Sequence, residues 1–228
     1  MNRFRWLQIE WGQTRFSSIA ELMLRSEYLR GSTLGFRLEK NRNDEIIGRF
    51  IEHRQIIDEI RDPFGQLISS TRDIFDVVRF RLTKQFPELE LQDAPRHFST
   101  FATKLAECAN FNISITPFRV NIERWAEGIK QELGATIVTA VTSSTFPLGN
   151  EAVARFSVGG PTDVRQQLHH FAIINAQYWD KARLKTVIDG KVSEYEISSR
   201  GTVCFRKGLN ENLLRVLRSK ISTVVPNG

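Results

Sequence analysis

FNISITPFRVNIERWAEGIKQELG, residues 111–134, shows the two periodicities from which the fold of this chain can be argued. Phe111, Ile113 and Ile115 alternate with polar residues, which predicts a half-buried strand with these three side chains facing the core. Asn121 can cap a helix that follows, and Gly134 can end that helix in a left-handed conformation. A strand followed directly by an amphipathic helix is therefore expected here.

The pattern continues to residue 188. Residues 135–146 and 153–158 favour strands, a helix is expected from Pro161 to Tyr178, and Leu184–Ile188 favours another strand. The order strand, helix, strand, strand, helix, strand is that of the split βαβ unit in ferredoxin-like folds. Asp189 and Gly190 then predict a two-residue hairpin turn, followed by strands at 192–197 and 202–205 and a basic helix at about 209–221.

The N-terminal part indicates a β-meander with one helix. A strand is expected at residues 4–11, a helix at 18–29 and the meander at 35–82, and Asp62-Pro63-Phe64-Gly65 forms its clearest turn. A helix with one apolar face is expected at 95–108. The predicted fold class is α+β, with a β-rich N-terminal domain over residues 1–87. A ferredoxin-like domain over residues 94–228 carries an added β-hairpin and a basic terminal helix.

Composition excludes several classes of protein. Hydrophobic residues make up 41% of the chain and charged residues 25%, so a packed core is expected in place of disorder. Two cysteines are too few for a disulfide scaffold, and no run of about 18 apolar residues suggests a membrane span. The first residues lack the apolar run of a signal peptide. The expected location is the cytoplasm, without membrane contact.

No catalytic or metal-binding motif is present. The four histidines, His53, His97, His169 and His170, do not have metal-ligand spacing, and no Gly-x-Ser-x-Gly elbow presents a nucleophile. Cys108 and Cys204 are interpreted as small core residues. No cofactor or metal is expected, and the chain is expected not to be an enzyme. The alternative is a nuclease or another enzyme with a dispersed site, in which His97, His169 or His170 lies in a cleft beside a carboxylate, Tyr or Lys.

Nucleic-acid binding is the hypothesis with residue support, because the chain carries a net charge of +6 and its last segment is basic. The open face of a split βαβ sheet would present Asn112, Ser114 and Thr116 beside the basic residues of its neighbouring strands. Such a platform has no stacking aromatic residues, so an RNA-recognition motif is not indicated. The predicted nucleic-acid contacts are Arg155, Arg183, Lys185, Arg200, Arg206, Lys207, Arg215 and Arg218.

The predicted function is that of a non-catalytic accessory or adaptor subunit of a multi-protein assembly, which contacts DNA or RNA through its basic C-terminal half. At least one protein partner, or self-association, is expected as well. A purely structural subunit or homo-oligomer is a further alternative, for which an exposed apolar patch is expected near Trp6 or Trp11. A role in bacterial antiviral defence is an additional hypothesis that no particular residue supports.

Overall fold

The computed structural model describes residues 2–95, 98–148, 152–170 and 179–225. Backbone contacts divide the chain into two units. The sheet unit comprises Met1–Gln8, Gln85–Glu90 and Thr116–Gly228, and the arm unit comprises Ile9–Lys84 and Leu91–Ile115. The units are interleaved along the chain, whereas the predicted ranges 1–87 and 94–228 are contiguous. That residues 1–87 and 94–228 fold as independent domains stays a prediction.

The protein is a mixed α+β structure with mostly antiparallel pairing, as predicted. In the sheet unit the strand order is β1, β11, β10, β9, β7, β8, and each neighbouring pair is antiparallel. These strands are β1 (Asn2–Glu10), β7 (Thr136–Leu148), β8 (Ala152–Gly159), β9 (Lys181–Ile188), β10 (Lys191–Ser198) and β11 (Thr202–Lys207). The last two residues of β1 belong to the arm unit.

The predicted order of elements between residues 111 and 188 is present as β6 (Ser114–Thr116), α3, β7, β8, α4 and β9. The specific ferredoxin-like arrangement is not confirmed, because β9 lies between β7 and β10 in the sheet. The turn between β9 and β10 is confirmed. Asp189 and Gly190 both have positive φ, 51° and 72°, and Ile188 pairs with Lys191 across the turn.

Two helices of the sheet unit have the expected caps. The side chain of Asn121 accepts a hydrogen bond from the backbone N–H of Arg124, and α3 (Ile122–Leu133) ends at Gly134 with a φ of 77°. Asn210 caps α5 (Glu211–Ile221) in the same way. The short α4 spans Arg165–His170, so Pro161 precedes the helix and does not lie in its first turn as predicted. The predicted continuation over residues 171–178 lies outside the described residues.

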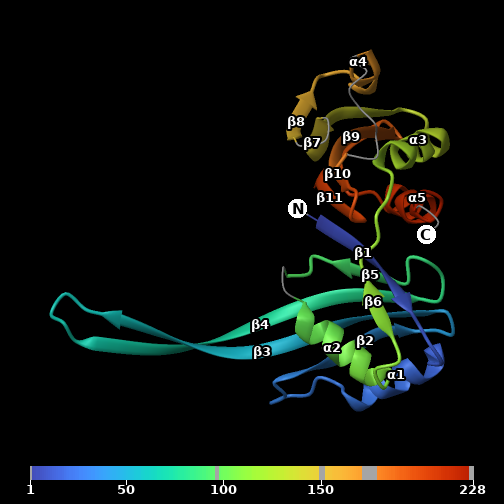
Figure 1. Ribbon diagram of the computed structural model, residues 1–228. Coiled ribbons are helices and arrows are strands. Elements are labelled where there is room, and N and C mark those ends of the chain that lie inside the picture. Colours follow the sequence, from blue (N-terminus) through green and yellow to red (C-terminus); the bar gives the residue numbers. More distant parts are fainter. Residues whose placement is uncertain (1, 96–97, 149–151, 171–178, 226–228) are drawn as a thin grey trace. The chain divides into compact units, whose positions relative to one another are not determined.

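α3 and α5 lie on the same face of the strands, and the core of the sheet unit fills the space between them and the sheet (Figure 1). Trp6 of β1 and Trp125 of α3 are fully buried there, with ring centroids 6.0 Å apart. The indole N–H of Trp125 donates to the carbonyl of Leu217 on α5 at 3.2 Å. These contacts fix both helices on one face, which leaves the opposite face of the sheet without a helix layer in the described part of this unit.

A buried carboxylate connects three segments of the sheet unit. Glu90 accepts a hydrogen bond from the indole N–H of Trp6 at 2.7 Å and receives two from the guanidinium of Arg218. The side chain of Glu90 is 7% exposed. Arg218, which the sequence suggested as a nucleic-acid contact, is therefore engaged in holding α5 against β1 and the Gln85–Glu90 segment.

The arm unit contains β2 (Leu34–Asn41), β3 (Glu45–Arg61) and β4 (Leu67–Thr83) in an antiparallel meander. Two helices, α1 (Phe16–Arg25) and α2 (Ser99–Cys108), complete it, and β5 (Leu89–Gln92) and β6 have residues in both units. Phe36, Phe50, Phe80 and Phe101 form an aromatic cluster, with ring centroids 5.1 to 6.4 Å apart. This cluster packs α2 onto the meander.

β3 and β4 are 17 residues long each, and they stay paired from Glu45 and Thr83 to Arg61 and Leu67. The strands predicted at residues 46–51 and 74–82 are thus much longer than expected. The predicted turn is confirmed, because the amide of Gly65 donates to the carbonyl of Asp62 at 3.0 Å and the Asp62 side chain accepts from Phe64 and Gln66. Residues 53–75, here called the arm, project from the arm unit as a two-stranded ribbon (Figure 1).

Two predicted elements near the second helix were wrong in part. α2 begins at Ser99, not near residue 95, although Phe101, Leu105 and Cys108 form its buried face as expected. Residues 111–113 are not in a strand. Asn110 and Phe111 have φ values of 50° and 58°, so the chain reverses after α2, and the side chain of Phe111 is 69% exposed, not inward. Among the helices that the structure describes, none has the length and apolar character needed to cross a membrane.

Candidate nucleic-acid interface

The sheet of the sheet unit has a polar face opposite α3 and α5, here called the open face. Strand alternation creates it: Phe4 and Trp6, Val203 and Phe205, and Ala182 and Leu184 enter the core. Their neighbours along the same strands must point the other way. The charged residues on this face are Arg3, Arg5, Arg155, Lys181, Arg183, Lys185, Glu194, Glu196 and Arg206.

A groove of about 800 Å³ lies on the open face. Its cationic lining is Arg3 from β1, Arg155 from β8, Lys181 from β9 and Arg200 from the turn between β10 and β11. Asp180 and Glu196 supply two carboxylates, so the described lining residues carry a net charge of +2. Thr142, Ser144, Ser198 and Thr202 add hydroxyl groups. Guanidinium, ammonium and hydroxyl donors on one concave surface are the groups that bind phosphate oxygens.

The arginines beside the groove are close enough to affect one another. Partial burial, and then the charges of Arg3 and Arg200, lower the pKa of Arg5 below its usual value. Arg3 and Arg5 lie on β1, whereas Arg200 is about two hundred residues away in the sequence and reaches them because β1 pairs with β11. A polyanion would relieve this mutual repulsion by supplying the opposite charge.

A well-anchored turn presents Arg200. The amide of Ser199 donates to the carbonyl of Asp180 at 2.9 Å, and its own carbonyl accepts from Val120 at 2.9 Å. The carbonyl of Gly201 accepts from the amide of Trp6 at 2.8 Å. Gly201 has a φ of 62°, and a Cβ there would lie 2.9 Å from the ring of Phe118. The turn is thus held on three sides, while Arg200 itself is exposed.

Several cations of the open face pair with carboxylates on neighbouring strands. Lys181 lies 3.1 Å from Glu196, Lys185 lies 3.1 Å from Glu194, and Arg206 lies 3.8 Å from Glu196. The lysine side chains are 56% and 43% exposed. Exposed pairs of this kind contribute about 0–1 kcal/mol, so an incoming phosphate can replace the carboxylate at little cost. The pairs therefore do not prevent these lysines from binding an anion.

The structure separates the predicted contact residues into two groups. Arg155, Arg183, Lys185 and Arg206 lie on the open face, and Arg200 lies on the groove beside it. Arg215 and Arg218 lie on α5, in the helix layer on the other side of the sheet, and Lys207 is exposed at the end of β11. Arg215 hydrogen-bonds Asn212 on its own helix at 2.7 Å. The open-face residues and the two arginines of α5 therefore lie on opposite sides of the sheet.

Sequence reasoning missed Arg3 and Lys181 as groove residues and misplaced Cys204. Arg3 alternates with Phe4 and Trp6, so its orientation was predictable, but the pairing of β1 with β11 was not. Cys204 lines the groove, because its neighbours Val203 and Phe205 are the core residues. Partial burial and the charge of Glu196 raise the pKa of its thiol. Cys108 is the buried residue that was expected, and burial raises the pKa of its thiol to about 11.

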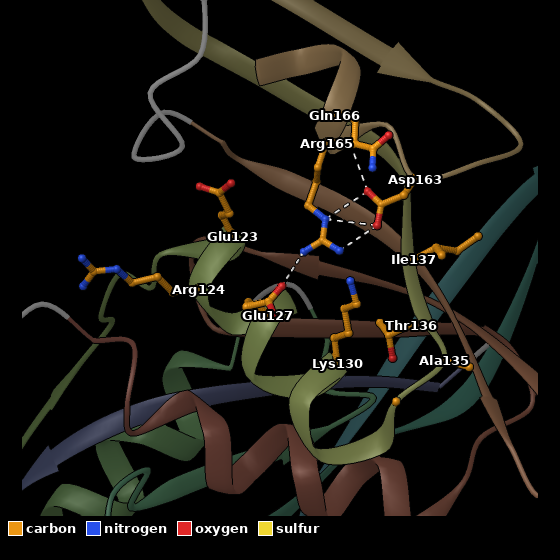
Figure 2. A pocket seen from close by; sticks show the side chains of 11 residues that line it. Glu123, Arg124, Glu127, Lys130, Ala135, Thr136, Ile137, Asp163, Arg165 and Gln166 are labelled. Atoms are coloured by element: carbon orange, nitrogen blue, oxygen red, sulfur yellow. Dashed lines mark hydrogen bonds and ion pairs between the residues drawn. The ribbon is translucent and has the colours of Figure 1, made fainter. Parts of the chain in front are cut away.

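A second cavity of about 670 Å³ lies beside α3 and α4 (Figure 2). Arg165 lies between two acids, with its guanidinium 2.7 Å from Asp163 and 3.0 Å from Glu127. Burial alone would raise the pKa of Asp163, but the hydrogen bonds and charge of Arg165 outweigh burial and lower it. Because Arg165 and the two acids satisfy one another, the described residues that line this cavity offer no unpaired buried charge for a ligand. The trio connects Asp163 and the start of α4 to α3.

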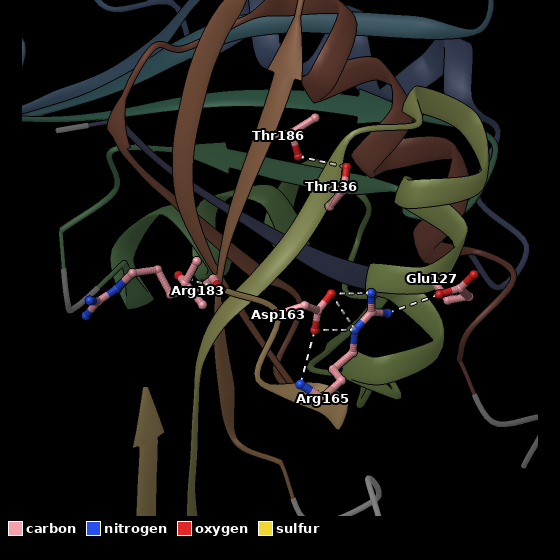
Figure 3. A network of polar contacts seen from close by, with 7 residues as sticks. Glu127, Thr136, Asp163, Arg165, Arg183 and Thr186 are labelled. Atoms are coloured by element: carbon pink, nitrogen blue, oxygen red, sulfur yellow. Dashed lines mark hydrogen bonds and ion pairs between the residues drawn. The ribbon is translucent and has the colours of Figure 1, made fainter. Parts of the chain in front are cut away.

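Three hydroxyl groups bond to one another in the core near this cavity, and Figure 3 shows the first two of them, on Thr136 and Thr186. Thr136 on β7 lies 3.0 Å from Thr186 on β9, which in turn lies 2.8 Å from the hydroxyl of Tyr195 on β10. All three residues are buried, and burial raises the pKa of Tyr195 well above its usual value. A neutral, mutually bonded set of hydroxyls holds three strands in register and supplies no acid or base near neutral pH.

The dispersed-enzyme alternative depends largely on positions that the structure does not describe. His97 and the side chains of His169 and His170 lie outside the described residues. His53 is on the arm, where it lies 2.7 Å from Asp73 and stacks on Phe75. In the described part of the chain, no group of three or more His, Cys, Asp or Glu residues is arranged to hold a metal ion.

No protein-family model matches the chain, and no curated protein matches its sequence.

Proposed function

We propose that the protein binds nucleic acid through the open face of the sheet unit and acts as a non-catalytic subunit of a larger assembly. The observation that carries this proposal is the groove in which Arg3, Arg155, Lys181 and Arg200 come together from four separate parts of the chain. Cations that converge on one concave, polar surface form the footprint that a phosphate backbone requires.

The lining indicates how nucleic acid would be held. Among the described residues that line the groove none is aromatic, so this part of the lining offers bases no ring on which to stack. Binding through phosphates and sugar hydroxyls alone is insensitive to sequence and sensitive to salt. If three or four phosphates are neutralised, the logarithm of single-strand affinity should fall with the logarithm of salt concentration with a slope of about −2 to −3. We therefore expect a single strand to bind with little sequence preference.

The test is a fluorescence-anisotropy titration with single- and double-stranded DNA and RNA at low and moderate salt. Arg155→Glu combined with Arg200→Glu reverses two charges that line the groove. We expect this variant to lose affinity at least about tenfold, because two charge-assisted contacts are removed and two repulsions added. The matched control is Arg124→Glu combined with Arg215→Glu, which makes the same charge change at exposed residues of α3 and α5.

The outcomes separate the candidate surfaces. Loss of binding in the groove variant alone supports the open face. A loss confined to the helix variant moves the interface to α5, where the sequence also suggested contacts at Arg215 and Arg218. No binding by the unaltered chain at low salt overturns the proposal and leaves the net charge of +6 without a nucleic-acid role.

A further inference from the structure

The groove on the open face contains a carboxylate without an ion-pair partner among the described residues. This residue is Asp180, which lines the groove immediately before β9. The other acidic residue of the described lining, Glu196, pairs with Lys181 and Arg206. Asp180 therefore keeps an uncompensated negative charge on a surface that cations otherwise dominate. Such a charge weakens the binding of a polyanion unless the ligand also offers it a hydrogen-bond donor.

A β-bulge in β7 holds the carboxylate of Asp180 in place. The register of β7 against β8 shifts between Ser143 and Phe146, where three steps along β7 lie opposite two along β8. Ser144 lies in this bulge, and its backbone N–H donates to Oδ2 of Asp180 at 2.6 Å. The hydroxyl of Ser144 donates to the same oxygen. The bulge thus turns a backbone donor and a side-chain donor of β7 toward Asp180.

The backbone of Asp180 is held on both sides as well. Its N–H donates to the carbonyl of Thr142 at 2.9 Å, and its carbonyl accepts from the amide of Ser199 at 2.9 Å. Both donors of Ser144 reach Oδ2, whereas Oδ1 accepts no hydrogen bond from a described residue. The groove therefore contains a preorganised acceptor with one oxygen left for a ligand.

This oxygen requires a hydrogen-bond donor, and the requirement distinguishes RNA from DNA. The phosphates and deoxyriboses of a DNA backbone offer only acceptors, whereas each ribose of RNA has a 2′-hydroxyl that can donate. Cations that can bind the neighbouring phosphates lie close to Asp180. Lys181 follows it directly in the chain, and Arg200 follows Ser199, the residue whose amide bonds the Asp180 carbonyl. An acceptor flanked by cations matches the succession of hydroxyl and phosphate groups along RNA.

We propose that the groove is selective for RNA, and that Asp180 provides this selectivity by accepting a hydrogen bond from a ribose 2′-hydroxyl. Arg155, Lys181 and Arg200 then bind the neighbouring phosphates. This inference rests on the proposed nucleic-acid function of the open face, to which it adds the type of nucleic acid. A hydrogen bond to a charged group at a partly exposed site corresponds to about a five- to tenfold preference for RNA.

The test compares three labelled oligonucleotides of equal length in anisotropy titrations of the full chain at low salt. They are oligouridylate, oligodeoxyuridylate and 2′-O-methyl oligouridylate, which share one base and differ only at the 2′ position. The 2′-O-methyl probe keeps the oxygen of the ribose but has no donor there. We expect the unaltered chain to bind oligouridylate about five- to tenfold more tightly than either of the other two probes.

Asp180→Ala removes the acceptor from the groove. It should bring the affinities for the RNA and DNA probes within about twofold of each other by weakening RNA binding. Affinity for the DNA probe should stay the same or rise, because a negative charge has been removed. The matched control is Glu132→Ala, which removes one carboxylate from α3, on the other side of the sheet. This control should keep the preference for RNA.

The outcomes separate this inference from the proposed function. Equal affinity of the unaltered chain for the RNA and DNA probes would overturn the selectivity and leave nucleic-acid binding by the open face in place. A preference that survives Asp180→Ala, or tight binding of the 2′-O-methyl probe, would overturn the role of Asp180. Loss of both RNA and DNA binding in Asp180→Ala would do so too, because it would make the residue structural. No binding of any probe would overturn the proposed function, and this inference with it.

Discussion

Glu90 is the residue on which three segments of the sheet unit depend. Its carboxylate accepts hydrogen bonds from Trp6 on β1 and from Arg218 on α5. Glu90→Ala leaves the indole N–H without its acceptor and the guanidinium without its counter-charge. Since Arg218 is 26% exposed and keeps some water, we expect a loss of about 2–3 kcal/mol in the free energy of unfolding, measured by urea denaturation.

Glu132→Ala is the control for Glu90→Ala, because it removes the other described acid that pairs with a basic residue of α5. Glu132 lies 3.0 Å from Lys220, and the two side chains are 50% and 27% exposed. An exposed pair contributes about 0–1 kcal/mol, so this variant should cost less than half as much as Glu90→Ala. Equal losses would show that burial of the Glu90 carboxylate has no special role in stability.

A second prediction for a single residue concerns Asp163 and the pH dependence of the protein's stability. Arg165 holds the pKa of Asp163 below its ordinary value of 3.8 despite partial burial. The carboxylate therefore stabilises the fold fully above the pKa of the unfolded chain, and this contribution is lost as the pH falls through the lower, folded pKa. Asp163→Asn should cost about 1–2 kcal/mol at neutral pH and make the urea midpoint less dependent on pH between about 5 and 2.

Asp189→Asn is the matched control for Asp163→Asn, because it makes the same chemical change at an exposed hairpin tip. Asp189 has a φ of 51°, a conformation that asparagine tolerates as well as aspartate does. The control should keep the pH dependence of the unaltered chain. If the urea midpoint of Asp163→Asn also keeps the pH dependence of the unaltered chain, the ion pair with Arg165 does not contribute to the loss of stability at low pH.

At the scale of elements, the turn that presents Arg200 can be tested through its glycine. Gly201→Ala places a Cβ at positive φ and within 2.9 Å of the Phe118 ring. Gly190→Ala, in the turn between β9 and β10, also places a Cβ at positive φ, here 72°. That Cβ would meet no atom within 4 Å. We expect about 1 kcal/mol of destabilisation for Gly190→Ala from backbone strain and about 2–3 kcal/mol for Gly201→Ala, measured by thermal or urea unfolding.

The difference between the two glycine variants measures the close approach of the turn to Phe118. If Gly201→Ala costs no more than Gly190→Ala, the turn has room to move and Arg200 is not rigidly held. Nucleic-acid affinity of Gly201→Ala gives a second readout, because a displaced Arg200 would weaken binding even where the protein stays folded.

Elements whose ends are determined by their own residues were predictable from the sequence. Asn121 caps α3, and Asp189 with Gly190 forms a hairpin, because the chemistry of each turn is local. Alternation also predicted that Arg155, Arg183 and Lys185 share a face. The groove was not predictable, since it requires β1 to pair with β11 at the other end of the chain. The ion pair between Arg218 and Glu90 was not predictable for the same reason, because its two residues lie far apart in the sequence.

The length of the arm could not be predicted from local sequence patterns either. Ile46–Ile51 and the residues after Ile74 have the apolar alternation of strands with one buried face. Between them, polar and apolar residues mix on both faces, which by itself suggests a loop. Pairing over the whole length arises because the strongly specified turn at Asp62–Gly65 sets the register of both strands. The sequence pattern therefore showed both ends of the ribbon but not its middle.

At the scale of the whole molecule, the interleaved units predict which fragments can fold. Met1–Gln8 belongs to the sheet unit, and its Phe4 and Trp6 are 3% and 0% exposed in the core. The fragment 94–228 lacks both aromatic residues and the Glu90 carboxylate. Removing even one buried aromatic side chain costs about 3–5 kcal/mol, a large part of the roughly 5–15 kcal/mol of a typical domain. We expect this fragment to show no cooperative unfolding transition by circular dichroism.

A synthetic peptide of residues 1–12 should restore cooperative unfolding when it is added to the fragment 94–228, because it returns β1 to the edge of β11. The same peptide with Trp6→Ala is the matched control and should bind far more weakly, since it cannot fill the space beside Trp125. The mixture also shows whether the fragment 94–228 is an independent domain or requires the N-terminal strand. If the fragment unfolds cooperatively without any peptide, residues 94–228 form an independent domain, as the sequence alone suggested. If only the intact peptide restores the transition, the N-terminal strand is an integral part of the C-terminal fold, and the chain must be complete to residue 205 before β1 finds its partner.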